Sequence, residues 1–133
     1  MTFWMEGDGN RIVIGKGTTT HGKIQLAACE GTSIMIGKDC MFSHDIYVRT
    51  TDSHPIYNKD GLRINPAEDI HIGDHVWIGM QSLILKGVVI PDGSVVGARS
   101  LVNKSFDVDE AIYAGQPAKL VKENMRWERE RKK

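Results

Sequence analysis

Residues 70–103 read IHIGDHVWIGMQSLILKGVVIPDGSVVGARSLVN, and an aliphatic residue recurs in this stretch at every sixth position. The recurring positions are Ile72, Ile78, Ile84, Ile90, Val96 and Val102, and the same spacing continues to Val108 and Ala114. The residues two places before the first seven of them are Ile70, Val76, Ser82, Val88, Ser94, Ser100 and Phe106. Two inward residues that lie two apart predict a very short strand, and a tight turn must follow it. Three such strands and their turns form one triangular coil, so the period predicts a parallel β-helix.

Glycine directly follows four of the inward aliphatic positions, at Gly73, Gly79, Gly97 and Gly115. Glycine suits a tight turn because it accepts positive φ and close approach of another chain segment. Gly79, Gly97 and Gly115 are each separated by one full coil of the repeat, so we expect them to stack at one corner of the prism.

The six-residue frame weakens at both ends of the chain and is interrupted in the middle. It holds at Ile36, Phe42 and Val48, but Ile14 is out of phase by four, which predicts an irregularity between about residues 20 and 31. Residues 53–69, SHPIYNKDGLRINPAED, lack the pattern and are rich in turn formers, so an extended loop is expected over 54–69. Helix-forming residues after Pro117 predict a short C-terminal helix at about 118–131 that caps the coil stack. The expected fold is one all-β domain over residues 1–133 with about five coils.

A β-sandwich is the alternative fold, but the turns of a sandwich are more widely and less evenly spaced, and they would not keep a six-residue phase. Lys and Arg together number 17, as do Asp and Glu, which argues against nucleic acid or an acidic membrane as partners. Cys29 and Cys40 form no metal or disulfide motif, and the N-terminus has no signal-peptide pattern. We therefore expect a cytoplasmic protein without membrane insertion.

Some positions between the inward pairs are apolar although they must face outward. Trp77 and Val95 would stack on one face of the prism, and Leu83 and Leu101 on the next. Apolar exteriors of this kind are typical of interfaces, and a closed homotrimer is expected. The alternative is that the extended loop or the C-terminal helix of the same chain covers these faces.

His54 opens the irregular loop in the segment RTTDSHPIYN, residues 49–58. Asp52 and Ser53 precede it, and Pro55 stiffens the exit. An exposed imidazole can accept a proton from an alcohol near neutral pH, although many loop histidines have no role. Ser53 lacks the surroundings of a catalytic nucleophile.

Four segments together carry a resemblance to a known family: RTTDSHPIYN (49–58), RINPAEDIHIGDHVWIG (63–79), GARSLVNKSF (97–106) and AGQPAKLVK (114–122). From Ile34 to Lys122 the chain resembles the hexapeptide-repeat acetyltransferases, in particular the sugar O-acetyltransferases of capsule and polysialic acid type. The galactoside, maltose and streptogramin acetyltransferases are more distant. The resemblance implies a left-handed β-helix, acetyl-coenzyme A as donor, and a sugar or polysaccharide hydroxyl as acceptor.

By the same resemblance His54 is the general base of a direct transfer without an acyl-enzyme, and Asp52 is a candidate to orient the imidazole. Backbone N–H groups at Gly79 and Met80 are candidates to stabilise the oxyanion, although the galactoside enzymes have a hydroxyl residue in place of Met80. The positions implied for coenzyme A are Trp77, Gly79, Met80, Ala98, Asn103, Lys104, Lys119 and Lys122. The candidates for acceptor binding are Ser53, Tyr57, Asn58, Arg63 and Gln25. No metal is expected.

Three other functions remain open. One is N-acetylation of an amino sugar, because the pattern does not distinguish oxygen from nitrogen as the acceptor. Another is a zinc enzyme like the γ-type carbonic anhydrases, for which His54, His71 and His75 would be the ligands. However, the separation of His71 and His75 is four, and that family has five. The last is a non-catalytic β-helix scaffold.

Overall fold

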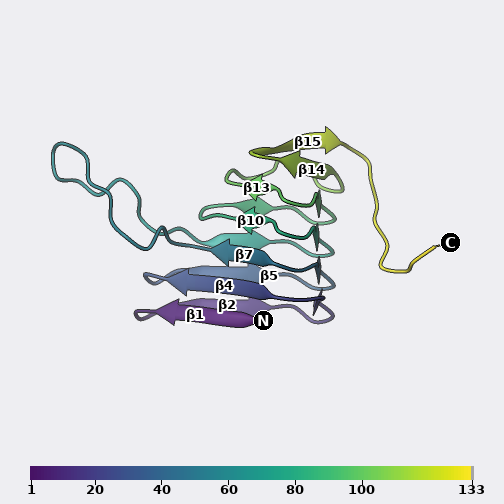
Figure 1. Cartoon of the computed structure of the whole chain (residues 1–133), viewed down its shortest axis with the longest axis horizontal. Coiled ribbons are helices and arrows are strands. Elements are labelled where there is room, and N and C mark those ends of the chain that lie inside the picture. Colours follow the sequence, from purple (N-terminus) through teal and green to yellow (C-terminus); the bar gives the residue numbers. More distant parts are fainter. Residues whose placement is uncertain (133) are drawn as a thin grey trace.

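The computed structural model describes residues 1–132 as a triangular parallel β-solenoid with three sheets along its three faces (Figure 1). The first sheet contains, in order, β1 (Thr2–Glu6), β4 (Ile24–Cys29), β7 (Ile46–Arg49), β10 (Leu83–Ile84) and β13 (Leu101–Val102). The second contains β11 (Val89–Ile90), β8 (Ile70–Ile72), β5 (Ser33–Ile36) and β2 (Arg11–Ile14). The third contains β15 (Ala118–Lys122), β14 (Ile112–Gly115), β12 (Val95–Val96), β9 (Trp77–Ile78), β6 (Met41–Phe42) and β3 (Thr19–Thr20). The predicted all-β solenoid is confirmed.

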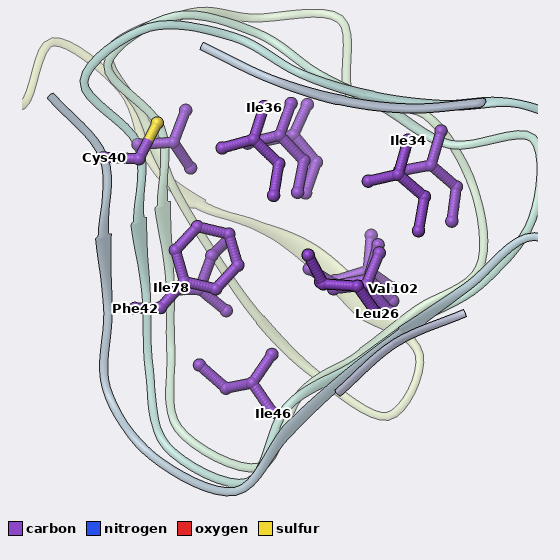
Figure 2. Close-up of a cluster of buried hydrophobic side chains, with 14 of the residues drawn as sticks. Leu26, Ile34, Ile36, Cys40, Phe42, Ile46, Ile78 and Val102 are labelled. Atoms are coloured by element: carbon purple, nitrogen blue, oxygen red, sulfur yellow. The ribbon is translucent and has the colours of Figure 1, made fainter. Parts of the chain in front are cut away.

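The six-residue frame sets the core of the central coils. Val96 pairs with Ile78, and Val102 pairs with Ile84, so each pair joins equivalent positions of successive coils. All four side chains are at most 1% exposed. The equivalent positions therefore form columns of side chains inside the prism (Figure 2). Such burial of aliphatic side chains is the main favourable term in the stability of the fold.

The N-terminal coils are longer than the central ones, and this difference accounts for the irregularity predicted between about residues 20 and 31. Ile14 pairs with Ile36, whereas in the regular coils Ile78 pairs with Val96, so more residues separate the two partners in the N-terminal pair. The additional residues extend β4 to Cys29 and form a corner at Glu30 and Gly31, where φ is 60° and 76°. These longer coils enlarge one corner of the first sheet, beside the point where the loop leaves the solenoid.

The regular frame ends at Val102, and its predicted continuation to Val108 and Ala114 is wrong. Val96 pairs with Tyr113 rather than with Ala114, so the last coil is shorter than the regular ones, and Val108 is only half-buried. The Tyr113 ring stacks on Phe106 with 3.7 Å between centroids, and its hydroxyl bonds the Val108 backbone. These two aromatic rings fill the end of the core, and the register therefore shifts by one residue.

The predicted glycine stack is correct for Gly79 and Gly97 but not for Gly115. The space beside the Gly97 Cα faces Ala114, which the register shift has brought into the place expected for Gly115. Gly115 instead has φ of 111° at the end of β14, where the chain turns into β15.

The predicted C-terminal helix at about 118–131 is also wrong. Residues 118–122 form β15, which pairs antiparallel with β14, and residues 123–132 follow without a helix or strand. We call residues 123–132 the strap. Helix propensity is outweighed here because an isolated helix of this length is only marginally stable, whereas strand pairing and burial of Trp127 are available.

The loop between β7 and β8 extends away from the prism (Figure 1). Its one bridge within the described chain joins Tyr57 and Arg63 in an antiparallel pair. Within residues 1–132 there is no helix long and apolar enough to span a bilayer.

Candidate functional site

A cavity of about 460 Å³ opens on the outer face of the first sheet, next to the base of the loop. We call it the His54 pocket. Outward-facing residues of β1, β4 and β7 form its floor, because side chains on a strand alternate between the core and the exterior. Its lining consists of Trp4, Glu6, Ala27, Cys29, Glu30, Tyr47, Arg49, Thr51, Ser53 and His54.

The chain reaches His54 through a braced corner. The Arg49 guanidinium donates from Nε to the Thr51 carbonyl at 2.7 Å and from Nη2 to the Ser53 hydroxyl at 2.6 Å. The Thr51 hydroxyl oxygen accepts the Ser53 N–H at 2.9 Å, and it also bonds the Glu30 carboxylate. These bonds hold Ser53 at φ of 74°, a conformation that costs energy for a residue other than glycine.

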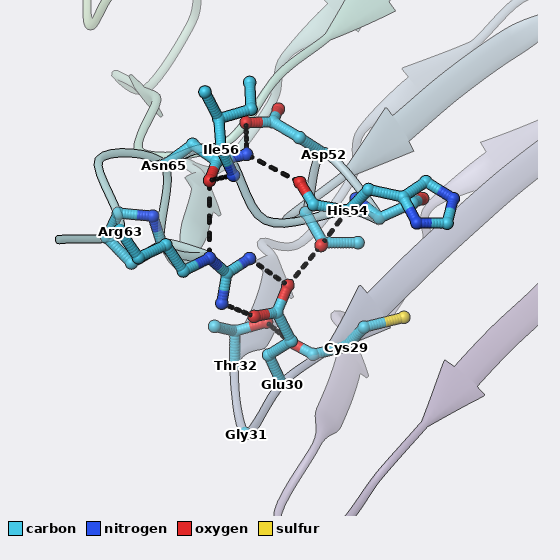
Figure 3. Close-up of polar contacts among 12 residues, drawn as sticks. Cys29, Glu30, Gly31, Thr32, Asp52, His54, Ile56, Arg63 and Asn65 are labelled. Carbon is cyan, nitrogen blue, oxygen red and sulfur yellow. Dashed lines mark hydrogen bonds and ion pairs between the residues drawn. The ribbon is translucent and has the colours of Figure 1, made fainter. Parts of the chain in front are cut away.

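The His54 imidazole is exposed, and within residues 1–132 its ring nitrogens make no hydrogen bond. Figure 3 shows the ring turned away from Asp52. The Asp52 carboxylate instead bonds Lys86 Nζ at 2.7 Å and Asn65 Nδ2 at 3.1 Å. Lys86, followed by Asn65, lowers the pKa of Asp52 against the opposing effect of burial. Asp52 is thus placed to hold the loop base rather than the imidazole.

Of the five candidates for acceptor binding, Ser53 alone lines the His54 pocket. Asn58 stabilises the tip of the loop, because its Oδ1 accepts the N–H groups of Asp60 and Leu62. Arg63 uses both terminal nitrogens on the Glu30 carboxylate, and this ion pair lowers the pKa of Glu30. Tyr57 is exposed in the loop, and Gln25 is an outward residue of β4 opposite Tyr47.

A second and larger cavity, of about 1090 Å³, lies on the outer face of the third sheet. We call it the strap groove, because residues of the strap form one wall. The sheet and corner residues that line it are Thr19, Thr20, His21, Met41, Ser43, His44, Trp77, Gly79, Met80 and Val95 to Ala98. The strap contributes Glu128, Arg129, Glu130 and Arg131.

Trp127 anchors the strap. Its side chain is 6% exposed and stacks on His75 with 3.9 Å between ring centroids. Trp127 Nε1 donates to the His75 carbonyl at 2.8 Å, and His75 Nε2 lies 2.9 Å from the Trp127 carbonyl. Asp39 completes the anchor by bonding both His75 Nδ1 and Arg129, and these two contacts lower the pKa of Asp39. The expected C-terminal helix is absent, but the strap lies beside β9, where the ring of Trp127 is 6.1 Å from that of Trp77, and Trp77 and Val95 still line the open groove.

The strap groove brings together four of the eight positions implied for coenzyme A, namely Trp77, Gly79, Met80 and Ala98. Asn103 and Lys104 follow β13, and Lys119 and Lys122 lie on β15; none of these four lines the groove. Of the two N–H groups predicted to bind an oxyanion, that of Gly79 donates to the Val96 carbonyl at 2.8 Å in the ladder. The Met80 N–H has no acceptor within residues 1–132.

The three histidines of the zinc alternative do not converge within the chain. Both ring nitrogens of His75 are engaged by Asp39 and Trp127. His71 lies on β8 of the second sheet, and His54 lies at the base of the loop. Residues 1–132 contain no group of three or more His, Cys, Asp or Glu side chains placed to hold a metal ion.

Sequence reasoning missed several residues that form the two cavities. Tyr47 and Arg49 were detectable, because they alternate with inward residues of β7 just before His54. Trp4 was not detectable, because its place beside the pocket depends on pairing across the longer N-terminal coil. The strap residues were assigned to a helix, so their contact with the third sheet was not foreseen.

Comparison with known proteins also identifies the six-residue repeat. The model of the bacterial transferase hexapeptide family, described as six repeats, matches residues 69–104. The chain is 48% identical over 112 residues to a polysialic acid O-acetyltransferase of Neisseria meningitidis, covering 84% of this chain and 52% of that protein. The chain belongs to the hexapeptide-repeat transferase family.

Two further members of this family are similar over nearly the whole chain. The polysialic acid O-acetyltransferase of Escherichia coli O1:K1 / APEC is 39% identical over 122 residues, covering 91% of this chain and 39% of that protein. The crystal structure of the polySia specific acetyltransferase NeuO superposes with a TM-score of 0.76 at 26% identity, covering 99% of this chain and 89% of that one. The chain spans about half or less of the length of the two curated relatives from Neisseria meningitidis and Escherichia coli.

Proposed function

We propose that this hexapeptide-repeat chain catalyses transfer of an acetyl group from acetyl-coenzyme A to a hydroxyl of a sugar or polysaccharide. His54 acts as the general base, and the strap groove binds the donor. The names of the relatives support the reaction class, because two of them are polysialic acid O-acetyltransferases, and they match 84% and 91% of this chain.

One observation carries the proposal. The exposed His54 lines a pocket on the outer face of the first sheet, whereas the strap groove lies on the third, and the two cavities share no lining residue. A complete site therefore needs two chains, with the His54 pocket of one facing the strap groove of the next. Such a head-to-tail contact closes into a ring when the rotation permits, and a homotrimer suits a three-sided prism.

The chemistry assigned to these groups is a direct transfer. His54 removes the proton of the acceptor hydroxyl, and the oxygen attacks the thioester carbonyl. The Met80 N–H is a donor for the oxyanion of the tetrahedral intermediate. The carbon–sulfur bond then breaks, and the imidazolium returns its proton to the thiolate of coenzyme A.

The lining of the His54 pocket supports a sugar acceptor. Trp4 and Tyr47 provide aromatic surface, and the Arg49 guanidinium lies 5.5 Å from the centre of the Tyr47 ring. A flat apolar surface beside polar donors suits the mixed character of a sugar ring. Both cysteines are free and buried, which supports a reducing compartment, and we propose the cytoplasm.

The proposal is tested by thiol release from acetyl-coenzyme A with a panel of sugars, nucleotide-sugars and sialic acid polymers, followed by product analysis. His54→Ala should lower kcat by at least about 100-fold, because general bases typically contribute about 10²–10⁴-fold. Its affinity for coenzyme A should be unchanged. The matched control is His71→Ala, since His71 is an exposed histidine on the second sheet that lines neither cavity. Undiminished turnover by His54→Ala would refute the assignment of the base.

Mixing two inactive variants tests the shared site. His54→Ala and Trp77→Ala chains are unfolded, combined and refolded together. If each site uses two chains, about a quarter of the interfaces in a randomly mixed ring carry both intact groups, and activity returns to that extent. Parent protein refolded in the same way serves as the control. If it regains activity and the mixed samples stay inactive, a site between chains is contradicted.

A further inference from the structure

Asn65 is a buried polar residue whose side chain uses its whole hydrogen-bonding capacity. The residue is 6% exposed. Its Oδ1 accepts the Ile56 N–H at 2.7 Å and Arg63 Nε at 3.3 Å. Its Nδ2 donates to the His54 carbonyl at 2.9 Å and to Asp52 Oδ2 at 3.1 Å. An asparagine amide has two donors and an oxygen with two lone pairs, so all four positions are occupied.

Two of these bonds hold the backbone on either side of Pro55. The carbonyl of His54 and the N–H of Ile56 enclose this proline, whose ring already fixes one backbone dihedral. Figure 3 shows Asn65 on one side of this segment and the imidazole on the other. The peptide groups that follow the His54 Cα are therefore tied to a single buried side chain.

The other two bonds tie Asn65 to ion pairs that reach the solenoid. Asp52 pairs with Lys86, which comes from the corner after β10. Arg63 pairs with Glu30, which forms the enlarged corner after β4. The loop is thus fastened at its base to two separate coils, and Asn65 links the two fastenings.

We propose that Asn65 is the positioning residue for the imidazole of His54, acting through the backbone of residues 54–56. This inference rests on the proposed role of His54 as general base. The ring itself has no hydrogen-bond partner in residues 1–132, so its location depends on its backbone and on the braced corner before it. A general base must lie within hydrogen-bond reach of the proton that it removes, and loss of the backbone anchor would disturb that distance.

The test is Asn65→Asp, which keeps the shape and both accepted bonds but removes both donated bonds. It also places a carboxylate beside Asp52. The matched control is Asn10→Asp: Asn10 Nδ2 also donates two hydrogen bonds, in its case to the backbone carbonyls of Glu6 and Gly7, while its Oδ1 accepts the Gly31 N–H. If the first variant does not accumulate as folded protein, Asn65→Ser, which keeps one small donor and acceptor, replaces it.

We expect kcat of the Asn65 variant to fall about 10- to 100-fold, while KM for acetyl-coenzyme A stays within about twofold, because misplacement by an ångström has this order of effect. The Ile56 amide should exchange its hydrogen faster, and Asn10→Asp should keep the kcat of the parent. A folded Asn65 variant whose kcat stays within about twofold would overturn the inference, even if its melting temperature is lower. Loss of turnover in His54→Ala with normal turnover in the Asn65 variant would overturn the positioning role alone. Full activity of His54→Ala would overturn both proposals.

Discussion

Replacement of Trp127 by alanine should detach the strap without unfolding the solenoid. The Trp127 side chain is 6% exposed. Its replacement removes both the stacking on His75 and the hydrogen bond from Nε1 to the His75 carbonyl. Truncation of a buried tryptophan costs about 3–5 kcal/mol. Because Trp127 packs on the outside of the third sheet and is not a member of the hydrophobic core cluster, this free energy is lost from a local docking equilibrium rather than from the core.

A cost of about 3 kcal/mol corresponds to an increase of about 100-fold in the population of the undocked strap. Limited digestion with trypsin measures this population, since Arg126, Arg129 and Arg131 lie within the strap. When opening is fast, the cleavage rate follows the equilibrium population of the open form. We therefore expect cleavage in the strap of Trp127→Ala to be about 100-fold faster, and the affinity for coenzyme A to fall because the groove loses one wall.

Trp4→Ala is the control for this experiment, because Trp4 is 62% exposed and makes no contact with the strap groove. It should leave the cleavage rate unchanged. Cleavage of Trp127→Ala within about threefold of the parent rate would refute the proposed anchor. So would cleavage that begins only at the melting temperature of the whole protein, since the strap would then not open locally.

Two further perturbations have outcomes that follow from the geometry. His75 and then Arg129 lower the pKa of Asp39 below its ordinary value of 3.8, so the anchor is stabilised above that pH and weakens as the pH falls through the lowered value. Hydrogen exchange in the strap should increase over this pH range in the parent protein but not in Asp39→Asn. A parent strap that stays protected would contradict this. Gly79→Ala would place a methyl group 2.7 Å from the Ala98 backbone nitrogen and should lower the free energy of unfolding in urea by about 1–3 kcal/mol. Gly97→Ala should lower it less, because its methyl group meets the side chain of Ala114. Equal losses of stability would contradict this.

The central coils and the position of the loop were predictable because each depends on residues close together in sequence. The inward columns from Ile72 to Val102 follow from a period that strand geometry imposes. The position of His54 at the base of the loop was predictable, because it stands where that period stops. The partner of Asp52 was not, since Lys86 lies far along the chain and meets it only after the coils have stacked.

The C-terminal predictions failed where packing competed with local preference. The frame continued in sequence to Val108, but the stacked rings of Phe106 and Tyr113 ended it at Val102. Residues 118–131 have helix formers, yet β15 pairs with β14 and Trp127 is buried on the third sheet. In both cases burial of large aromatic side chains stabilised the observed structure by more free energy than the local helix or repeat preference would have contributed.

The sequence by itself determined a prism of six-residue steps, because alternating inward residues and tight turns leave no other regular way to bury the aliphatic positions. Only the tertiary structure decided how the site is built. In the folded chain Asp52 pairs with Lys86, Asn65 has four hydrogen-bond partners, and Trp127 of the strap stacks on His75. These contacts join segments from different coils, and their distances are set by the length of each coil and by the shapes of the side chains that fill it.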